Sequence, residues 1–282
     1  MANKTIVVTG GAGFIGSHLC EALQKAGHRV ISLDNYFVGS KDNHVAGVEY
    51  RAGHTKDIAT LIPESPDLVY HLGEYSRVEI SLTEPDKVWD LNTQGTCGVL
   101  EFWRNRKCKL VYAGSSTKFG DGGLGRLQSP YAWSKASNTE LVGNYGRWYN
   151  LPYAITYFYN VYGPRERPAH EYGTLIETFR RQMKSGNVLT VVSPGTQKRN
   201  FTHVKDIVEG LLAIGERGEG DEYGLGAEES FSVLEVAKLF GGSIEMLPER
   251  AGNRMDSTLD TAKSRALGWS ARHKLGDYIR AI

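Results

Sequence analysis

The sequence predicts an α/β fold with a doubly wound, mainly parallel sheet and a smaller C-terminal α/β part. Two observations lead to this prediction. Short apolar runs rich in β-branched residues alternate with segments of helical periodicity. A glycine-rich turn joins the first apolar run to the first helical segment. Strands that are apolar throughout are typical of parallel sheets covered on both faces.

The expected elements follow one another in a regular order. Strands are predicted at residues 5–10, 29–34, 67–73, 109–116 and 153–163. Helices are predicted over 16–27 and 85–104, and from Ser129 onward. After these, a loop-like stretch leads into shorter elements, among them a strand at 188–192 and a helix at 204–218. This order is the alternation of a Rossmann-type sheet.

The same order suggests two parts. We expect residues 1–165 to form a Rossmann domain, with 201–218 packing back onto it, and 166–282 to form a smaller substrate-binding part. No flexible linker separates the two, so they should share a cleft.

Composition excludes several classes of function. The 282 residues are 40% hydrophobic and carry a formal charge of +1, and the basic residues form no stripe, so neither nucleic acid nor an anionic membrane is the expected partner. Three cysteines without a CxxC pair and eight scattered histidines predict neither a disulfide framework nor a metal site. With no apolar run of membrane-spanning length and no leader pattern, we expect a cytoplasmic globular protein.

The turn "VTGGAGFIGSHL" is typical of dinucleotide binding. Gly10 permits the tight turn, Gly13 lets the backbone approach a pyrophosphate, and Gly16 allows close packing of the helix. Asp34 ends the next strand, where its carboxylate would accept hydrogen bonds from ribose hydroxyls and repel a 2′-phosphate. This favours NAD over NADP. Asp57 could reach the adenine amino group, although a surface acid is an equal interpretation.

Tyr131 and Lys135 in "SPYAWSK" lie four residues apart on a helix that Ser129 caps and Pro130 begins, so they share one face. A free phenol has a pKa near 10, and ionising one near neutral pH requires on the order of 4 kcal/mol. An ammonium about 4 Å away at an effective dielectric of about 20 supplies roughly that much. The pair therefore predicts a tyrosine general base assisted by a lysine.

With these motifs in this order, the chain resembles the extended short-chain dehydrogenase/reductase family, and within it the nucleotide-sugar epimerases and dehydratases. The further stretches that carry the resemblance are "LDN", "HLGEYSRVEISLTEP", "NTQGT", "SST", "NVYGPRE", "RNFTHVKDIV" and "RAGNRMDSTLDTAKSRALGW". The resemblance implies further cofactor contacts from Phe14, Ile15, Asn35, Ile58, Leu72, Gly73 and Asn92.

The resemblance also implies a reaction. Ser115 aligns with the family's catalytic Ser/Thr, and Thr117 could assist it. Tyr131 would take a hydroxyl proton while NAD accepts the hydride, which gives a keto sugar. The related dehydratases carry an Asp-Glu pair where this chain has Ser116 and Thr117, and the related decarboxylases place a glutamate at the position of Thr117. What remains is epimerisation, and we predict a UDP-hexose 4-epimerase.

Substrate and partner are also implied by the resemblance. Asn160, Arg199 and Arg250 would contact the substrate diphosphate, and the helices that carry "NTQGT" and "YAWSK" would form a homodimer. Two alternatives stay open. One is a 4,6-dehydratase or keto-sugar reductase on the same scaffold. The other is a non-catalytic NAD-binding regulatory protein, which would have no need to keep Ser115, Tyr131 and Lys135 together.

Overall fold

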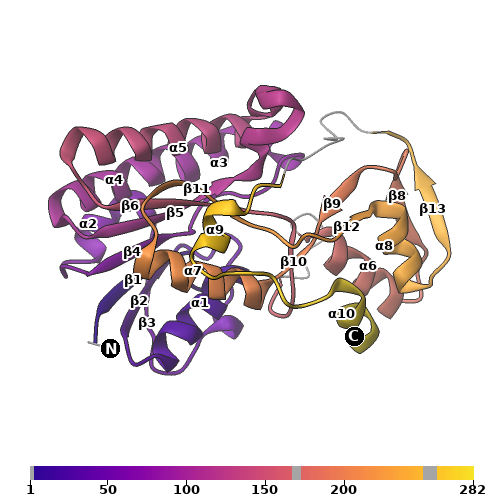
Figure 1. Cartoon of the computed structure of the whole chain (residues 1–282), viewed down its shortest axis with the longest axis horizontal. Helices are drawn as coiled ribbons and strands as arrows, with labels where there is room; N and C mark the ends of the chain where they lie inside the picture. The colour runs from indigo at the N-terminus through magenta and orange to yellow at the C-terminus, as the bar shows by residue number, and fades with distance from the viewer. Residues whose placement is uncertain (1–2, 167–172, 250–258) are drawn as a thin grey trace.

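The computed structural model of the protein describes residues 3–166, 173–249 and 259–282. A larger lobe is built on one sheet, and a smaller lobe lies beside it (Figure 1). The sheet has seven strands in the order β11-β6-β5-β4-β1-β2-β3, and all of its strand pairs are parallel. Its strands are β1 (Thr5–Thr9), β2 (Arg29–Asp34), β3 (Glu49–Ala52), β4 (Leu68–His71), β5 (Lys109–Ser115), β6 (Tyr153–Phe158) and β11 (Gly220–Leu225).

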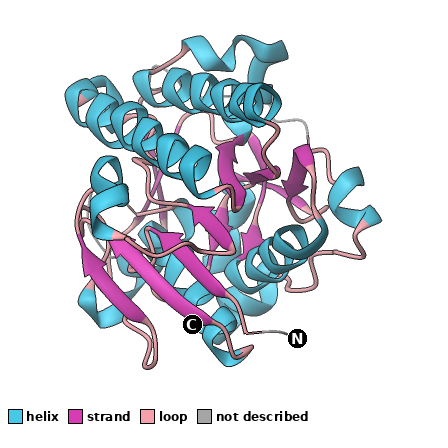
Figure 2. Ribbon diagram, turned by 90° about the vertical axis from the view of Figure 1, so that its left-hand side faces the viewer, coloured by secondary structure: helices cyan, strands magenta, loops and turns pink. Residues whose placement is uncertain are grey.

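Helices cover both faces of this sheet (Figure 2). Helices α1 (Phe14–Lys25) and α7 (Val204–Arg217) lie on one face, and α2 (Ile58–Leu61), α4 (Gly95–Arg106) and α5 (Pro130–Tyr149) lie on the other. Successive residues of β1 divide between the two faces, because strand side chains alternate: Val7 packs with the second group, and Ile6 and Val8 with the first.

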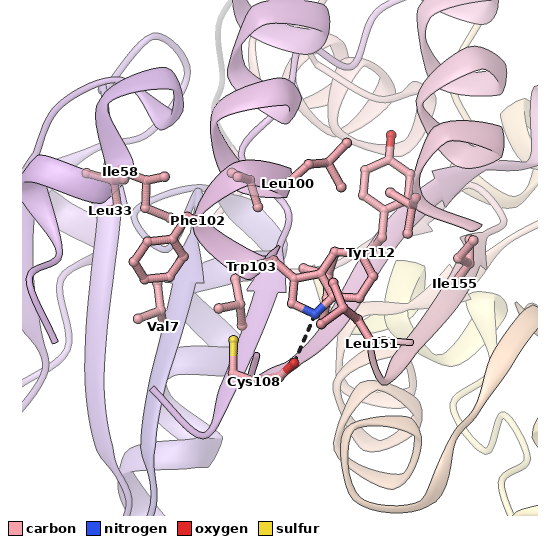
Figure 3. Packing of buried hydrophobic residues seen from close by; sticks show 14 of the residues in the cluster. Val7, Leu33, Ile58, Leu100, Phe102, Trp103, Cys108, Tyr112, Leu151 and Ile155 are labelled. Carbon is pink, nitrogen blue, oxygen red and sulfur yellow. Dashed lines mark hydrogen bonds between the residues drawn. The ribbon is translucent and has the colours of Figure 1, made fainter. Parts of the chain in front are cut away.

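The core on the α4 face is filled by large side chains (Figure 3). Trp103 of α4 is fully buried there, and its indole Nε1 donates a hydrogen bond to the carbonyl oxygen of Cys108 at 2.9 Å. This bond links the end of α4 to the residue before β5, so the connection between the helix and the strand is held close to the sheet.

The predicted helix at 85–104 consists of α3 (Pro85–Val88), a π-helical turn over Trp89–Gln94, and α4. Short 3₁₀ turns connect other elements, over Lys41–Asn43, Thr55–Asp57, Ile80–Leu82 and Ser116–Leu127. The last of these leads directly from β5 to α5, the two elements that carry the predicted catalytic residues.

The smaller lobe has its own core, in which Phe179, Val236 and Leu275 pack together. Its helices are α6 (Leu175–Lys184), α8 (Val233–Phe240) and α10 (Leu275–Ala281). Its strands pair two by two: β7 (Val161–Tyr162) with β10 (Thr202–His203), β8 (Leu189–Val192) with β13 (Ile244–Leu247), and β9 (Lys198–Asn200) with β12 (Ser230–Ser232).

The chain returns to the larger lobe twice after β7. Helix α7 and strand β11 do so first, and the segment around α9 (Ala262–Ala266) then packs against β11. Trp269 is buried there, and its Nε1 donates to the carbonyl of Asp206 at 2.7 Å. The sheet thus contains β11, which lies outside the residues predicted for the Rossmann domain, 1–165 and 201–218.

Two strands of the seven-stranded sheet were not predicted. Strand β3 reads EYRA and β11 reads GDEYGL, and both lie at the edges of the sheet. Edge strands carry charged residues that prevent further pairing, so they lack the apolar runs of the inner strands. In the described residues, no helix combines the length and apolar character needed to cross a membrane.

Candidate active site

A cleft of about 590 Å³ lies along the carboxyl ends of the parallel strands, which is where open α/β sheets bind ligands. Both lobes line it, since the smaller lobe contributes Thr174, Arg199 and Phe201. Most of the predicted site residues also line it: Gly10, Gly13, Phe14, Ile15, Gly16, Asp34, Asn35, Leu72, Gly73, Ser115, Tyr131, Lys135, Asn160 and Arg199.

Three predicted cofactor residues do not line the cleft. Asp57 is exposed, and the side chain of Ile58 is fully buried in the core. Asn92 is also buried, and its amide bonds the backbone of Tyr75 and the hydroxyl of Ser134, so its polar atoms support local structure. The side chain of Thr117 and the whole of Arg250 fall outside the described part of the chain.

The glycine turn is shaped by close backbone contacts. Gly10 has φ +73°, and a Cβ there would lie 2.8 Å from the Cα of Gly73. A Cβ on Gly16 would lie 2.1 Å from the carbonyl oxygen of Gly10. Gly13 caps α1 without a side-chain hydrogen bond, and the first residues of the helix line the cleft. The N–H groups of a first helical turn are suited to bind an anion, and those of α1 lie at the cleft.

Asp34 is held in place at the end of β2. Its carboxylate accepts hydrogen bonds from the backbone N–H of Ala12 at 2.9 Å and of Tyr36 at 2.8 Å. Burial raises its pKa, and the two N–H donors oppose that rise. Gly39 approaches so closely that a Cβ there would be 2.9 Å from Oδ1. The carboxylate is thus fixed beside the glycine turn, as ribose recognition requires.

The structure brings Tyr131 and Ser115 together. The hydroxyl of Tyr131 donates to Oγ of Ser115 at 3.2 Å, across the gap between α5 and the end of β5. Ser129 caps α5 as predicted, and its Oγ accepts from the N–H of Ala132 at 3.1 Å. Because the cap fixes the first turn of α5, it also fixes the direction of Tyr131.

Lys135 has a counter-ion that sequence reasoning missed. Its ammonium forms a salt bridge with the carboxylate of Glu74, and the side chains of both are almost fully buried. The sequence argument treated Lys135 as an unpaired cation, so the field that it exerts on Tyr131 is weaker than that argument assumed. Glu74 lies three residues after the end of β4 and lines the cleft, and its place in the sequence does not reveal the pairing with Lys135.

Asn160 and Arg199, the two predicted substrate contacts within the described residues, both line the cleft. Asn160 adopts a positive φ of 37°, and its Nδ2 donates to the carbonyl of Asn200 at 3.0 Å. The guanidinium of Arg199 donates to the carbonyl of Lys198 at 2.8 Å. Within the described ranges, no group of three or more His, Cys, Asp or Glu side chains is arranged to hold a metal ion.

The fold and the cleft define a dinucleotide-binding α/β enzyme with a tyrosine, a serine and a lysine at its centre. The model of the NAD dependent epimerase/dehydratase family matches residues 6–226, and the chain belongs to this family. Its cofactor is NAD. The glycine turn and the carboxylate of Asp34 fit this cofactor, since a side chain at Gly10 or Gly16 would fill the space beside the turn.

Known relatives carry out more than one reaction. UDP-glucuronic acid decarboxylase 6 of Arabidopsis thaliana is 30% identical over 97% of this chain and 86% of its own. Among solved structures, the UDP-glucose 4-epimerase of Thermotoga maritima with UDP-glucose has a TM-score of 0.90 at 27% identity. The UDP-glucose 4-epimerase of Thermus thermophilus with NAD has a TM-score of 0.88 at 28% identity. Each structure aligns with 98% of this chain and 96% of its own.

Proposed function

We propose that the chain is an NAD-dependent nucleotide-sugar epimerase that inverts C4 of a UDP-hexose through a transient 4-keto sugar. The observation that carries the proposal is the hydrogen bond between Tyr131 and Ser115, 3.2 Å long, in a cleft that also holds Lys135 and the glycine turn. A non-catalytic NAD-binding protein would need the turn alone.

The glycine turn and Asp34 would hold NAD, which would supply a reversible hydride acceptor for the oxidation at C4 and the reduction that inverts it. Tyr131 would accept the proton of the C4 hydroxyl and give it back in the second half of the cycle. Ser115 would hold the C4 oxygen by a hydrogen bond, within reach of the phenol. Proton and hydride both return, so the cycle leaves the enzyme unchanged.

The residues after Ser115 favour epimerisation over elimination or loss of CO₂. Ser116 and Thr117 offer no carboxyl group that could act as acid or base there. The relatives include a decarboxylase, and a 4,6-dehydratase or keto-sugar reductase remains the alternative on this scaffold. Epimerisation, dehydration and decarboxylation would all begin with the same oxidation and differ in the fate of the ketone, whereas a reductase would start from a keto sugar and NADH.

The diphosphate of the substrate would lie toward the smaller lobe. Arg199 lines the cleft there, and its guanidinium can donate two parallel hydrogen bonds to phosphate oxygens. Asn160 borders the same region and Arg250 completes the proposed set. The UDP-glucose in the Thermotoga maritima structure supports a uridine nucleotide as the carrier.

The experiment that tests this function incubates the purified protein with UDP-, GDP- and dTDP-hexoses and follows the products by NMR. We expect a C4-inverted sugar without net formation of NADH. A Tyr131→Phe variant serves as the matched control, because it keeps the ring and removes only the hydroxyl. A 4-keto-6-deoxy product or released CO₂ would replace the proposal with dehydration or decarboxylation. Bound NAD without any turnover would favour the regulatory alternative.

We also propose a homodimer that forms through α4 and α5, and a cytoplasmic location. Two exposed tryptophans support the dimer: Trp89, directly after α3, and Trp133 of α5 are in edge-to-face contact with ring centroids 5.6 Å apart. Exposed large aromatics of this kind are typical of interfaces. Cys20 and Cys108 are buried free thiols, as in proteins of reducing compartments.

A further inference from the structure

Glu74 is a buried carboxylate inside the proposed catalytic cleft. It lies three residues after the end of β4, and 3% of its side chain is exposed, against 6% for its partner Lys135. An ion pair this deep is costly to bury, since both groups lose their hydration. Such a pair therefore calls for a reason beyond stability.

The hydrogen bonds around Glu74 all point toward it. Besides the ammonium of Lys135, it accepts from the hydroxyl of Thr96 at 2.8 Å, the hydroxyl of Tyr112 at 3.1 Å and Nδ2 of Asn138 at 2.9 Å. An ionised carboxylate is an acceptor only, with room for about four such bonds. Two of the four partners, the ammonium of Lys135 and the amide nitrogen of Asn138, can only donate. These contacts favour the charged form of Glu74.

Lys135 is fixed by the same network. Its Nζ donates to Glu74, to the carbonyl of Ala113, and to the hydroxyl of Tyr112 at 3.1 Å. Three acceptors match the three N–H bonds of an ammonium. Tyr112 therefore accepts from Lys135 and donates to Glu74, so it joins the two charges.

Two further titratable groups packed around the pair, His71 on β4 and Tyr112 on β5, carry no charge near neutral pH. The third is Tyr131 on α5, the proposed general base. Burial lowers the pKa of His71 to about 4, and burial and Glu74 raise that of Tyr112 well above its ordinary range. Glu74 is therefore the counter-charge of Lys135 within this network.

We propose that Glu74 is a positioning residue for catalysis: it keeps Lys135 charged and holds the ammonium one helical turn from Tyr131. This inference deepens the proposed epimerase and rests on it. Burial lowers the pKa of Lys135, and Glu74 opposes that effect. Without the carboxylate, Lys135 would lose its proton at a lower pH, as buried lysines without a partner do.

The first test compares pH profiles of kcat for the UDP-hexose that the wild type converts. In Glu74→Gln, which keeps the shape and removes the charge, we expect the alkaline limb to move at least one pH unit lower. Glu74→Asp should restore it, because the charge returns. Tyr112→Phe removes a neutral hydrogen bond and should leave the limb in place. An unmoved limb in Glu74→Gln, or an equal shift in Tyr112→Phe, would overturn the inference.

The second test needs no substrate, so it separates this inference from the proposed function. In folded Glu74→Gln the pKa of Lys135 should be lowered, whereas in the unfolded chain it is 10.5. At pH values between these two, Lys135 is protonated in the unfolded state and neutral in the folded state, so the stability of the variant rises with pH. The deficit in melting temperature of Glu74→Gln should therefore shrink as the pH rises from 7 to 10. The double variant Glu74→Gln/Lys135→Met should melt above Glu74→Gln at pH 7. A deficit that stays constant with pH, or a double variant that melts lower, contradicts the role.

Discussion

Replacing Gly10 by alanine should destabilise the protein by about 2–5 kcal/mol, and the structure gives two parts of that loss. The φ of +73° is left-handed, which costs a residue with a Cβ about 1–2 kcal/mol. The new Cβ would also lie 2.8 Å from the Cα and 2.9 Å from the N of Gly73. Those are backbone atoms that cannot swing aside, and overpacking of this kind costs about 1–3 kcal/mol.

The assay is urea unfolding followed by circular dichroism, with Gly27→Ala as the matched control. Gly27 also has a positive φ, +85°, but a Cβ there would meet nothing within 4 Å. We expect Gly27→Ala to lose only the conformational part, about 1–2 kcal/mol. NAD binding, measured by calorimetry, should weaken in Gly10→Ala and stay unchanged in Gly27→Ala, since only the former displaces the floor of the cleft.

Equal losses in the two variants would refute the reasoning. They would mean that the turn after β1 can shift to make room for a Cβ without loss of stability. The close contact of Gly10 with Gly73 would then not shape the cleft. Unchanged NAD affinity in a destabilised Gly10→Ala would separate stability from binding in the same experiment.

The other predictions concern chemistry, cofactor choice, pH and assembly. Tyr131→Phe should lower kcat by about 10²–10⁴-fold while NAD stays bound, as followed by NMR of the UDP-hexose and by release of the nucleotide on denaturation. Asp34→Ser should weaken NAD binding by about 1.5–3 kcal/mol and reduce the preference over NADP in calorimetric titrations; an unchanged preference would contradict its assigned role. Burial raises the pKa of Glu166 from 4.5 to about 7, so the folded state holds a proton between those values and stability falls as pH rises through them. Urea titrations at pH 4.5 and 7 should show that the free energy of unfolding falls by roughly 3 kcal/mol less in Glu166→Gln than in the wild type. Trp133→Glu should give a monomer in light scattering, and a dimer that survives the change would place the interface elsewhere.

The parts of the site that could be predicted are those set by local chain geometry. The glycine turn requires a strand followed by a helix, and the pairing of Tyr131 with Ser115 requires a capped helix start beside a strand end. Each of these features is recognisable as a motif within a short stretch of sequence. Parallel strands then place the residues of these motifs at one edge of the sheet.

What could not be predicted depends on contacts between distant segments. Glu74 meets Lys135 and Asn138 only after β4 and α5 are packed together, and a single glutamate after a strand gives no sign of that. Asp57 and Asn92 were assigned to the cofactor from their place in a motif, and neither residue lines the cleft. Their actual partners are decided by tertiary packing, which a motif does not encode.

The position of β11 bears on how the chain folds as it is synthesised. The neighbour of β6 in the sheet, β11, is synthesised only with residues 220–225. Trp269, which packs on the face of the sheet covered by α1 and α7, is synthesised later still. A nascent chain that has released β1 to β6 therefore has an open sheet edge, and such edges are prone to pair with other chains. The Rossmann sheet of this protein is therefore completed only after the first elements of the smaller lobe, from β7 to β10, have been synthesised.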